Sequence, residues 1–339
     1  MSAASATPAN APGPHRRMIA VMVLIPVLVA LALWAFAWPA ARTAPRDVPI
    51  GIAGPASAAA QLEQRFEQRK GAFDIHRYDD EAAARTAVKD RVVYGAAVVT
   101  DEGPRLLTAS AGSPAVAQLL RDAVTAQAPG GAQVPVTDVV PTPSGDPRGS
   151  ALGASILPLA LAGVAAGAVV SLMRLRGLRA ATALIGASVL VGITAAALAD
   201  SWLGVLTGSW WAEAGVLGLA VLAVGATVAG LAALIGTPGL GIGGLLVVLL
   251  GNPFSGAASA PELLPEPVGM IGQWLPPGAA ATLLRSVAYF DGNGAGGAML
   301  TLSLWAGLGL VAVLLAGRRG GRPTAAATEG RAPEPMPVG

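Results

Sequence analysis

The chain has no cysteine and little charge. Only 12% of its 339 residues are Asp, Glu, Lys or Arg, against about 25% in soluble domains. Without cysteine there is no thiol catalysis, no disulfide and no Cys-ligated metal site. A net charge of +2 leaves no large basic face for nucleic acid. What remains is apolar, with 53% hydrophobic residues and a mean hydropathy of +0.60, which predicts a membrane protein.

Residues for nucleotide or metal chemistry are also scarce. The two lysines, Lys70 and Lys89, are not followed by Ser or Thr, so neither fits the phosphate-binding pattern G-x-x-x-x-G-K-[ST]. The two histidines, His15 and His76, stand too far apart for an H-E-x-x-H motif. We therefore predict no enzyme activity and no catalytic, cofactor-binding or metal-binding residue. Any ATP hydrolysis would belong to a partner subunit.

Long uncharged runs predict about six membrane spans, because a helix of about 20 residues covers the hydrocarbon core of a bilayer. The predicted spans are 18–38, 151–173, 180–199, 214–235, 238–251 and 298–316. The fifth is short. The first competes with a cleaved signal peptide, but its apolar run exceeds the roughly 7–15 residues of such peptides, so we expect a retained anchor.

Between residues 42 and 149 charges return and the pattern changes to short alternating blocks. Strand-like runs at 48–53, 73–78, 92–100, 105–109 and 134–140 alternate with helical segments at 55–70, 79–91 and 113–127. This alternation predicts a small α/β domain inserted between the first and second spans, with a linker at 141–149. Residues 1–17 and 318–339 are expected to be disordered cytoplasmic ends.

Three arginine clusters set the expected orientation. With six spans they fall on one side of the membrane, and the positive-inside rule makes that side the cytoplasm. Both termini are then cytoplasmic, and the α/β domain is extracytoplasmic at the plasma membrane. The clustered residues are Arg16, Arg17, Arg174, Arg176, Arg179, Arg318, Arg319 and Arg322.

The segment 252–297 is too apolar for an ordinary loop, yet its prolines forbid one continuous span. We predict two short helices, about 267–275 and 277–289, re-entrant or lying on the membrane surface. A loop that merely covers the bundle is the alternative. The residues that mark this re-entrant or outer-helix element are Pro253, Pro265, Pro276, Pro277 and Arg285.

The predicted spans carry no ionisable residue at mid-membrane, where ion-coupled carriers usually keep one. Asp200 and Glu213 stand only at span ends. This favours a path for an apolar or amphipathic substrate, or no path, although backbone carbonyls could still bind an ion. Gly163 and Gly167 form a G-x-x-x-G pattern that is typical of close helix packing within a bundle or a dimer.

This layout resembles the permease subunits of type-2 ABC exporters (the ABC-2 membrane family) and the related phage-infection-protein family. The run NPFSG…APELLP…IGQWLPPGAAATLLRS at Asn252–Ser286 is similar to the family's pattern before its last helix, with Arg285 at the family's Arg position. The sequences IAG at 52–54 and YGAAVV at 94–99 resemble its outer domain. One feature departs from the family, because residues 1–14 are not expected to form its usual amphipathic helix along the membrane.

The resemblance implies a permease subunit that moves an amphipathic or lipid-like substrate across the plasma membrane. It also implies a homodimer or heterodimer driven by a separate cytoplasmic ATPase subunit, with Arg174, Arg176 and Arg179 in the coupling loop. These arginines could instead serve only to set topology. A different class of function also fits, namely a membrane-anchored receptor or scaffold whose outer domain binds a cell-wall component, a phage or a protein without transport.

Overall fold

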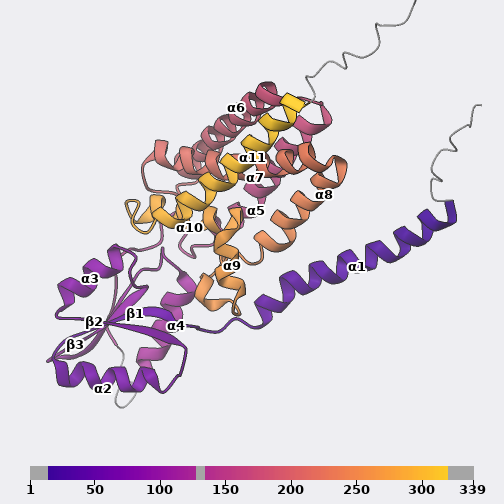
Figure 1. Ribbon diagram of the computed structural model, residues 1–339. Coiled ribbons are helices and arrows are strands. Elements are labelled where there is room, and N and C mark those ends of the chain that lie inside the picture. Colours follow the sequence, from indigo (N-terminus) through magenta and orange to yellow (C-terminus); the bar gives the residue numbers. More distant parts are fainter. Residues whose placement is uncertain (1–13, 127–133, 320–339) are drawn as a thin grey trace, which may run out of the picture.

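The computed structural model describes residues 14–126 and 134–319, which form a helical bundle and an α/β domain (Figure 1). The predictions of disorder for residues 1–13 and 320–339 concern residues outside this description. The helices are α1 (Pro14–Ala41), α2 (Ala56–Glu67), α3 (Glu81–Lys89), α4 (Pro114–Thr125), α5 (Ala151–Leu172), α6 (Gly177–Ala196), α7 (Trp210–Ile235), α8 (Thr237–Leu245), α9 (Val268–Trp274), α10 (Pro276–Tyr289) and α11 (Gly296–Arg319). The strands are β1 (Val48–Ala53), β2 (Phe73–Tyr78), β3 (Gly95–Thr100), β4 (Gly103–Thr108) and β5 (Val136–Asp138).

Five of the described helices are long and apolar enough to cross a bilayer, so the chain is a multi-pass membrane protein as predicted. They are Met18–Ala41, Ala151–Leu172, Gly177–Trp202, Trp210–Ile235 and Gly296–Arg318. Two short stretches that the sequence predicts to be disordered are helical. Helix α1 includes Arg16 and Arg17, and α11 includes Arg318 and Arg319.

The fifth predicted span, 238–251, is the short apolar helix Thr237–Gly251, formed by α8 and a π-helical continuation. Its first turn packs on the end of α7, where a Cβ added at Gly239 would collide with the Leu231 carbonyl. Its last residue lies against α10, because a Cβ at Gly251 would stand 2.7 Å from Pro277 Cγ. The segment therefore leads from one end of the bundle to the other, although it is shorter than the remaining spans.

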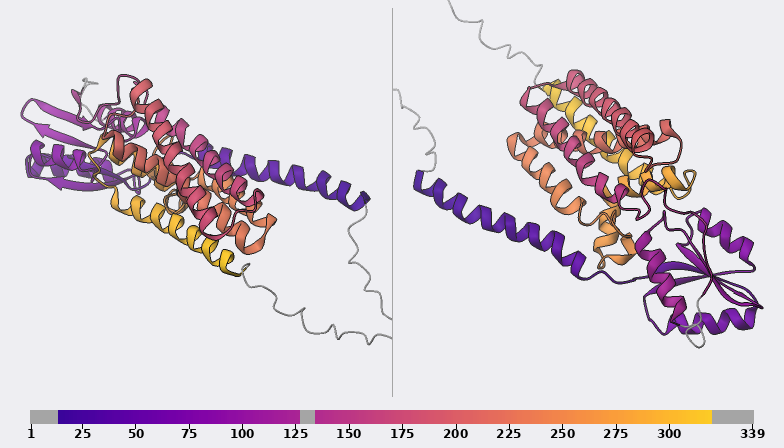
Figure 2. Two further views of the ribbon diagram at one scale, coloured as in Figure 1. Left: turned by 90° about the horizontal axis from the view of Figure 1, so that it is seen from above. Right: turned by 180° about the vertical axis from the view of Figure 1, so that it is seen from behind.

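Helix α7 forms the centre of the bundle and α1 stands apart from it (Figures 1 and 2). In the most apolar stretch of α7, 61% of residues are buried, compared with 28% in α5, α6 and α11 and 6% in α1. The small side chains of α7 permit this central position, since neighbouring helices approach its backbone closely. A single chain therefore leaves almost all of α1 for lipid or for a partner.

The α/β domain contains a five-stranded sheet in the order β2-β1-β3-β4-β5. Strand β1 pairs in parallel with β2 and β3, β3 and β4 form an antiparallel hairpin, and β4 pairs in parallel with β5. Helices α2 and α4 pack on one face of the sheet through Phe66 and Leu120, and α3 packs on the other through Val88. Strands β1 and β2 have the predicted bounds, whereas β5 is shorter than the predicted 134–140 run.

Short polar side chains start several helices by accepting backbone N–H groups that have no partner within the helix. Asp80 accepts the N–H of Ala83 at the start of α3. Asp146, in the linker after the sheet, accepts the N–H groups of Ser150 and Ala151 with its two carboxylate oxygens. This carboxylate therefore fixes where the domain ends and the bundle begins.

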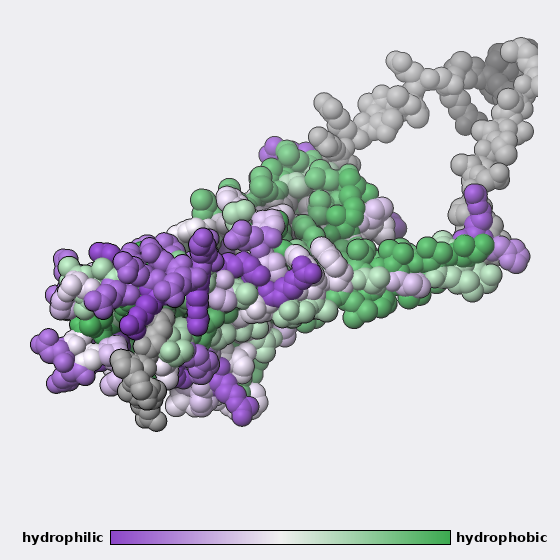
Figure 3. All heavy atoms as spheres, turned by 90° about the horizontal axis from the view of Figure 1, so that it is seen from below, coloured by the Kyte–Doolittle hydropathy of each residue, from purple (hydrophilic) through white to green (hydrophobic). Residues whose placement is uncertain are grey.

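The α/β domain lies at one end of the bundle, while α1 starts and α11 ends at the other (Figures 1 and 2). Figure 3 shows hydrophilic residues gathered over the domain and hydrophobic residues along α1. We call these the domain end and the arginine end, because the α5–α6 loop with Arg174 and Arg176, and the first turn of α6 with Arg179, lie at the end away from the sheet.

Candidate functional site

Helix α10 lies between the bundle and the α/β domain. Leu283 and Leu284, both buried, belong to the core that α10 shares with α5, α7 and α11. Pro276 and Pro277 occupy its first turn. The backbone N–H groups of a first turn have no partner within the helix, so the N–H that proline lacks is not needed there. The two predicted short helices are thus present as α9 and α10, but α10 is enclosed by protein. Where α10 lies relative to the membrane stays a prediction.

Arg285 is buried in α10, with 5% of its surface exposed. Its Nη2 donates to the carbonyl oxygen of Ala257 at 3.0 Å. The bond fastens the loop after α8 to α10. Removal from water lowers the pKa of the Arg285 guanidinium, and the nearby Tyr94, Tyr289 and Glu262 oppose that shift.

The loop after α8 is also held by close backbone packing. The side-chain amide of Gln273 donates to the Ser255 carbonyl at 2.9 Å. A Cβ added at Gly272 would collide with the carbonyl group of Phe254, so α9 can approach this loop only through a glycine. Pro253 lies in the same loop and lines a cavity of about 350 Å³ beside α1, and the Pro265 carbonyl accepts the N–H of Val268 at the start of α9.

Arg91, which follows α3 in the α/β domain, reaches α10. Its Nη1 donates to the Thr282 carbonyl at 3.1 Å and to the Ser286 hydroxyl. The guanidinium also lies over the Phe290 ring, 5.2 Å from its centroid. Burial lowers the pKa of Arg91 to about 10, partly offset by Tyr94, so this guanidinium stays charged at neutral pH.

A second connection joins the sheet to the segment before α9. The Tyr94 hydroxyl donates to Glu262 Oε2 at 2.8 Å. The N–H groups of Ala44 and Arg46 donate to the carbonyl oxygens of Leu263 and Glu262. Leu263 is itself buried in the core of the α/β domain. Burial, and after it the Glu262 carboxylate, raises the pKa of Tyr94 well above its usual range, so the phenol keeps the proton it donates.

Sequence reasoning did not single out Arg91 or Glu262, and it noted Tyr94 only within the YGAAVV run. Each contact joins residues about 170 to 195 positions apart in the chain. No periodicity or local motif encodes a pairing at that separation. The only available signal was that this apolar, proline-rich segment also carries Glu262 and Arg285.

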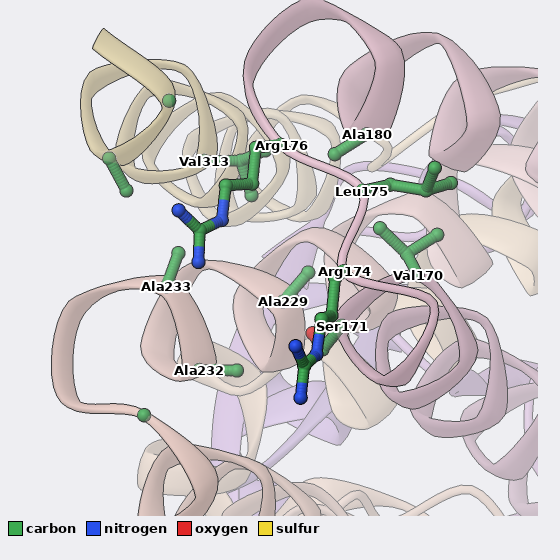
Figure 4. Close-up of a pocket in the computed structure, with 13 residues that line it drawn as sticks. Val170, Ser171, Arg174, Leu175, Arg176, Ala180, Ala229, Ala232, Ala233 and Val313 are labelled. Atoms are coloured by element: carbon green, nitrogen blue, oxygen red, sulfur yellow. The ribbon is translucent and has the colours of Figure 1, made fainter. Parts of the chain in front are cut away.

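At the arginine end the last turns of α5, α7 and α11 and the start of α6 enclose a cavity of about 520 Å³ (Figure 4). Arg174 and Arg176 line it, whereas Arg179 lies exposed on α6 and does not. Arg174 has a left-handed backbone with φ of 56°, which is uncommon for a residue other than glycine. Arg174 and Arg176 thus lie in the α5–α6 loop and line the cavity, whereas Arg179 lies in the first turn of α6 and outside the cavity.

Gly163 and Gly167 lie where α5 crosses α7. A Cβ at Gly163 would stand 2.6 Å from Val224 Cβ, and one at Gly167 would stand 2.6 Å from the Gly225 carbonyl oxygen. Both distances are too short for a real Cβ, so these glycines let the two helices touch. In a single chain the G-x-x-x-G face is already occupied by α7.

Glu213 is more deeply placed than its position at a span end suggested. Its side chain is fully buried, its Oε1 accepts the N–H of Gly208 at 2.8 Å, and its Oε2 has no partner among the described residues. Within the same described part of the chain, no group of three or more His, Cys, Asp or Glu could hold a metal ion.

Comparison with known proteins gives one finding for the first part of the chain. Neither the curated proteins nor the solved structures contain a match. Residues 16–137, which comprise α1 and the α/β domain as far as β5, match the family model described as "ABC-2 family transporter protein". The match supports the resemblance to ABC-2 permeases, while the relation to the phage-infection-protein family stays a prediction.

Proposed function

We propose that this chain is the membrane permease subunit of an ABC-2-type exporter, and that it moves an amphipathic or lipid-like substrate. The family match over residues 16–137 carries the proposal. The architecture supports it, because the matched helix and domain are continuous with a bundle of four further full-length spans. The uncharged interior of these spans suits a substrate with a large apolar part.

ATP hydrolysis belongs in this proposal to a separate subunit, because neither lysine of the chain stands in a phosphate-binding loop. We place the contact with that subunit at the α5–α6 loop, with Arg174, Arg176 and Arg179. The side chains of these arginines have no hydrogen bond or ion pair within residues 14–126 and 134–319, so their guanidinium groups are available to acidic side chains of a partner.

The orientation completes this account. The arginine end faces the cytoplasm and the α/β domain lies outside the plasma membrane, as the positive-inside rule predicts for these clusters. In that orientation a change at the cytoplasmic loop can reach the outer domain through α10, because α10 packs on the bundle and hydrogen-bonds to Arg91.

A second permease subunit, either another copy of this chain or a related one, would pack against α1. The large side chains of α1 are mostly half or more exposed, with Met22 at 62% and Leu33 at 64%. Lipid alone could cover this helix, but the wide separation of α1 from α5–α8 also leaves room for helices of a partner (Figure 2).

The test is to co-express the tagged chain with a candidate ATPase subunit and to measure co-purification and ATP hydrolysis in proteoliposomes. We expect the triple change of Arg174, Arg176 and Arg179 to Ala to abolish both. The matched control changes the same three residues to Lys, which keeps the topological charge. A protein that binds no ATPase in either form would contradict the permease function and favour the receptor or scaffold alternative.

A further inference from the structure

The cavity at the arginine end has an apolar wall and a positively charged rim. Its wall is apolar and comes from three helices, with Val170 of α5, Ala229 and Ala232 of α7, and Val313 of α11. Its rim carries Arg174 and Arg176, whose side chains extend from the α5–α6 loop toward the last turn of α7 (Figure 4). A volume of about 520 Å³ is large enough for a small-molecule headgroup.

The charge at this rim is not balanced within the described part of the chain. None of the residues that line the cavity is acidic, and neither arginine side chain has an ion pair or hydrogen bond within the described residues. The one hydroxyl in the lining, that of Ser171, already donates to the Gly167 carbonyl at 2.8 Å. Among the side chains that line the cavity, the two guanidinium groups are therefore the ones that carry charge.

The loop that carries these arginines has a backbone of some conformational cost. Arg174 adopts a left-handed backbone, and Gly177 with φ of 55° does the same three residues later. For a residue with a Cβ this conformation is disfavoured and persists only where the surroundings impose it. Leu175, between the two arginines, anchors the loop by packing against the cluster that contains Val170 and Leu184.

We propose that this cavity binds the anionic headgroup of a membrane lipid, with phosphate on the two guanidinium groups and the adjoining acyl chain along the α7–α11 wall. Guanidinium groups recognise phosphate oxygens through paired N–H donors. The apolar wall favours a ligand with a hydrocarbon part over free phosphate, which would remain hydrated. The site lies at the ends of membrane helices, where lipid headgroups are present. The proposal goes beyond the transport function, because this binding requires no ATPase.

The purified full-length chain in detergent can be titrated with spin-labelled phosphatidylglycerol and phosphatidylcholine of equal chain length, while the immobilised fraction is measured. We expect a preference of about tenfold for phosphatidylglycerol, because its headgroup is a net anion, whereas the choline cation of phosphatidylcholine would lie beside the two guanidinium groups. The double variant Arg174→Gln/Arg176→Gln should lose it. Arg179→Gln removes one positive charge from the neighbouring first turn of α6 but not from the cavity, and it should keep the preference.

A variant that changes shape and not charge provides a second test. Ala232→Phe should fill the cavity and reduce phosphatidylglycerol binding while all three arginines remain. Equal losses in Arg179→Gln and in the double variant would overturn the proposal, because they would indicate unspecific attraction to a basic surface. Full competition by inorganic phosphate at the lipid's own concentration would overturn it as well. Helical circular dichroism of each variant ensures that only folded protein is compared.

Discussion

The arginines at the two ends of the bundle have different surroundings. At the domain end Arg91 and Arg285 are surrounded by protein and donate to carbonyl or hydroxyl oxygens. At the arginine end Arg174 and Arg176 line an open cavity, and their guanidinium groups have no hydrogen-bond or ion-pair partner among the described residues. The same residue type therefore fastens two parts of the protein together at one end and offers unpaired charge at the other. The difference follows from what surrounds each guanidinium group.

The largest effect is expected from a clash at the domain end. Gly272→Leu in α9 would drive a side chain into the Phe254 carbonyl, and we expect a loss of about 3 kcal/mol or more in the free energy of unfolding. The control is Gly241→Leu in α8, an exposed glycine with nothing within 4 Å of an added Cβ, which should change stability by less than about 0.5 kcal/mol. Thermal unfolding in detergent measures both. Equal effects would show that the domain end is no more tightly packed than α8.

The second largest loss in the free energy of unfolding is expected when a buried arginine is removed. Arg285→Ala leaves the Ala257 carbonyl without its donor and opens a cavity in α10, which together should cost about 2–4 kcal/mol. Arg179→Ala at the arginine end, where the side chain is exposed, should cost less than about 0.5 kcal/mol. A denaturant titration of the two variants compares the ends directly. If Arg285→Ala proved as stable as Arg179→Ala, the fastening role of Arg285 would be wrong.

A smaller loss of stability is expected where the contact between sheet and bundle is weakened. Tyr94→Phe removes only the hydroxyl that donates to Glu262, so we expect a loss of about 1 kcal/mol. Combining it with Glu262→Ala, which removes the acceptor, in a double-mutant cycle should give less than the sum of the two single effects, because either change breaks the same contact. The exposed pair of Arg105 and Glu102 is the reference, and its cycle should give a coupling near zero. Additive effects at Tyr94 and Glu262 would contradict the contact.

Much of the fold follows from local patterns. Uncharged runs predict the long spans, and alternation with turn residues predicts β1 and β2 at their observed bounds. Prolines predict where α10 begins, since Pro276 and Pro277 fit only a first turn. The signals act within a few residues, and the local structure responds to them directly.

The contacts between distant segments could not be predicted in the same way. The Arg91 contact with Ser286 and the Tyr94 contact with Glu262 depend on how the domain rests on α10. The cavity at the arginine end depends equally on the relative positions of α5, α7 and α11. The arginines were recognisable as a cluster, but their division into two that line the cavity and one that does not is visible only in three dimensions.

The central claim is that the two ends face opposite sides of the membrane, with the α/β domain outside. Because the chain lacks cysteine, single cysteines report position without background. We choose Ala115→Cys, exposed on α4, and Leu178→Cys, 72% exposed at the arginine end. In intact cells a membrane-impermeant maleimide should label the first and not the second, and both should be labelled after lysis. Labelling of the cysteine at 178 in intact cells, with the cysteine at 115 protected, would contradict the account.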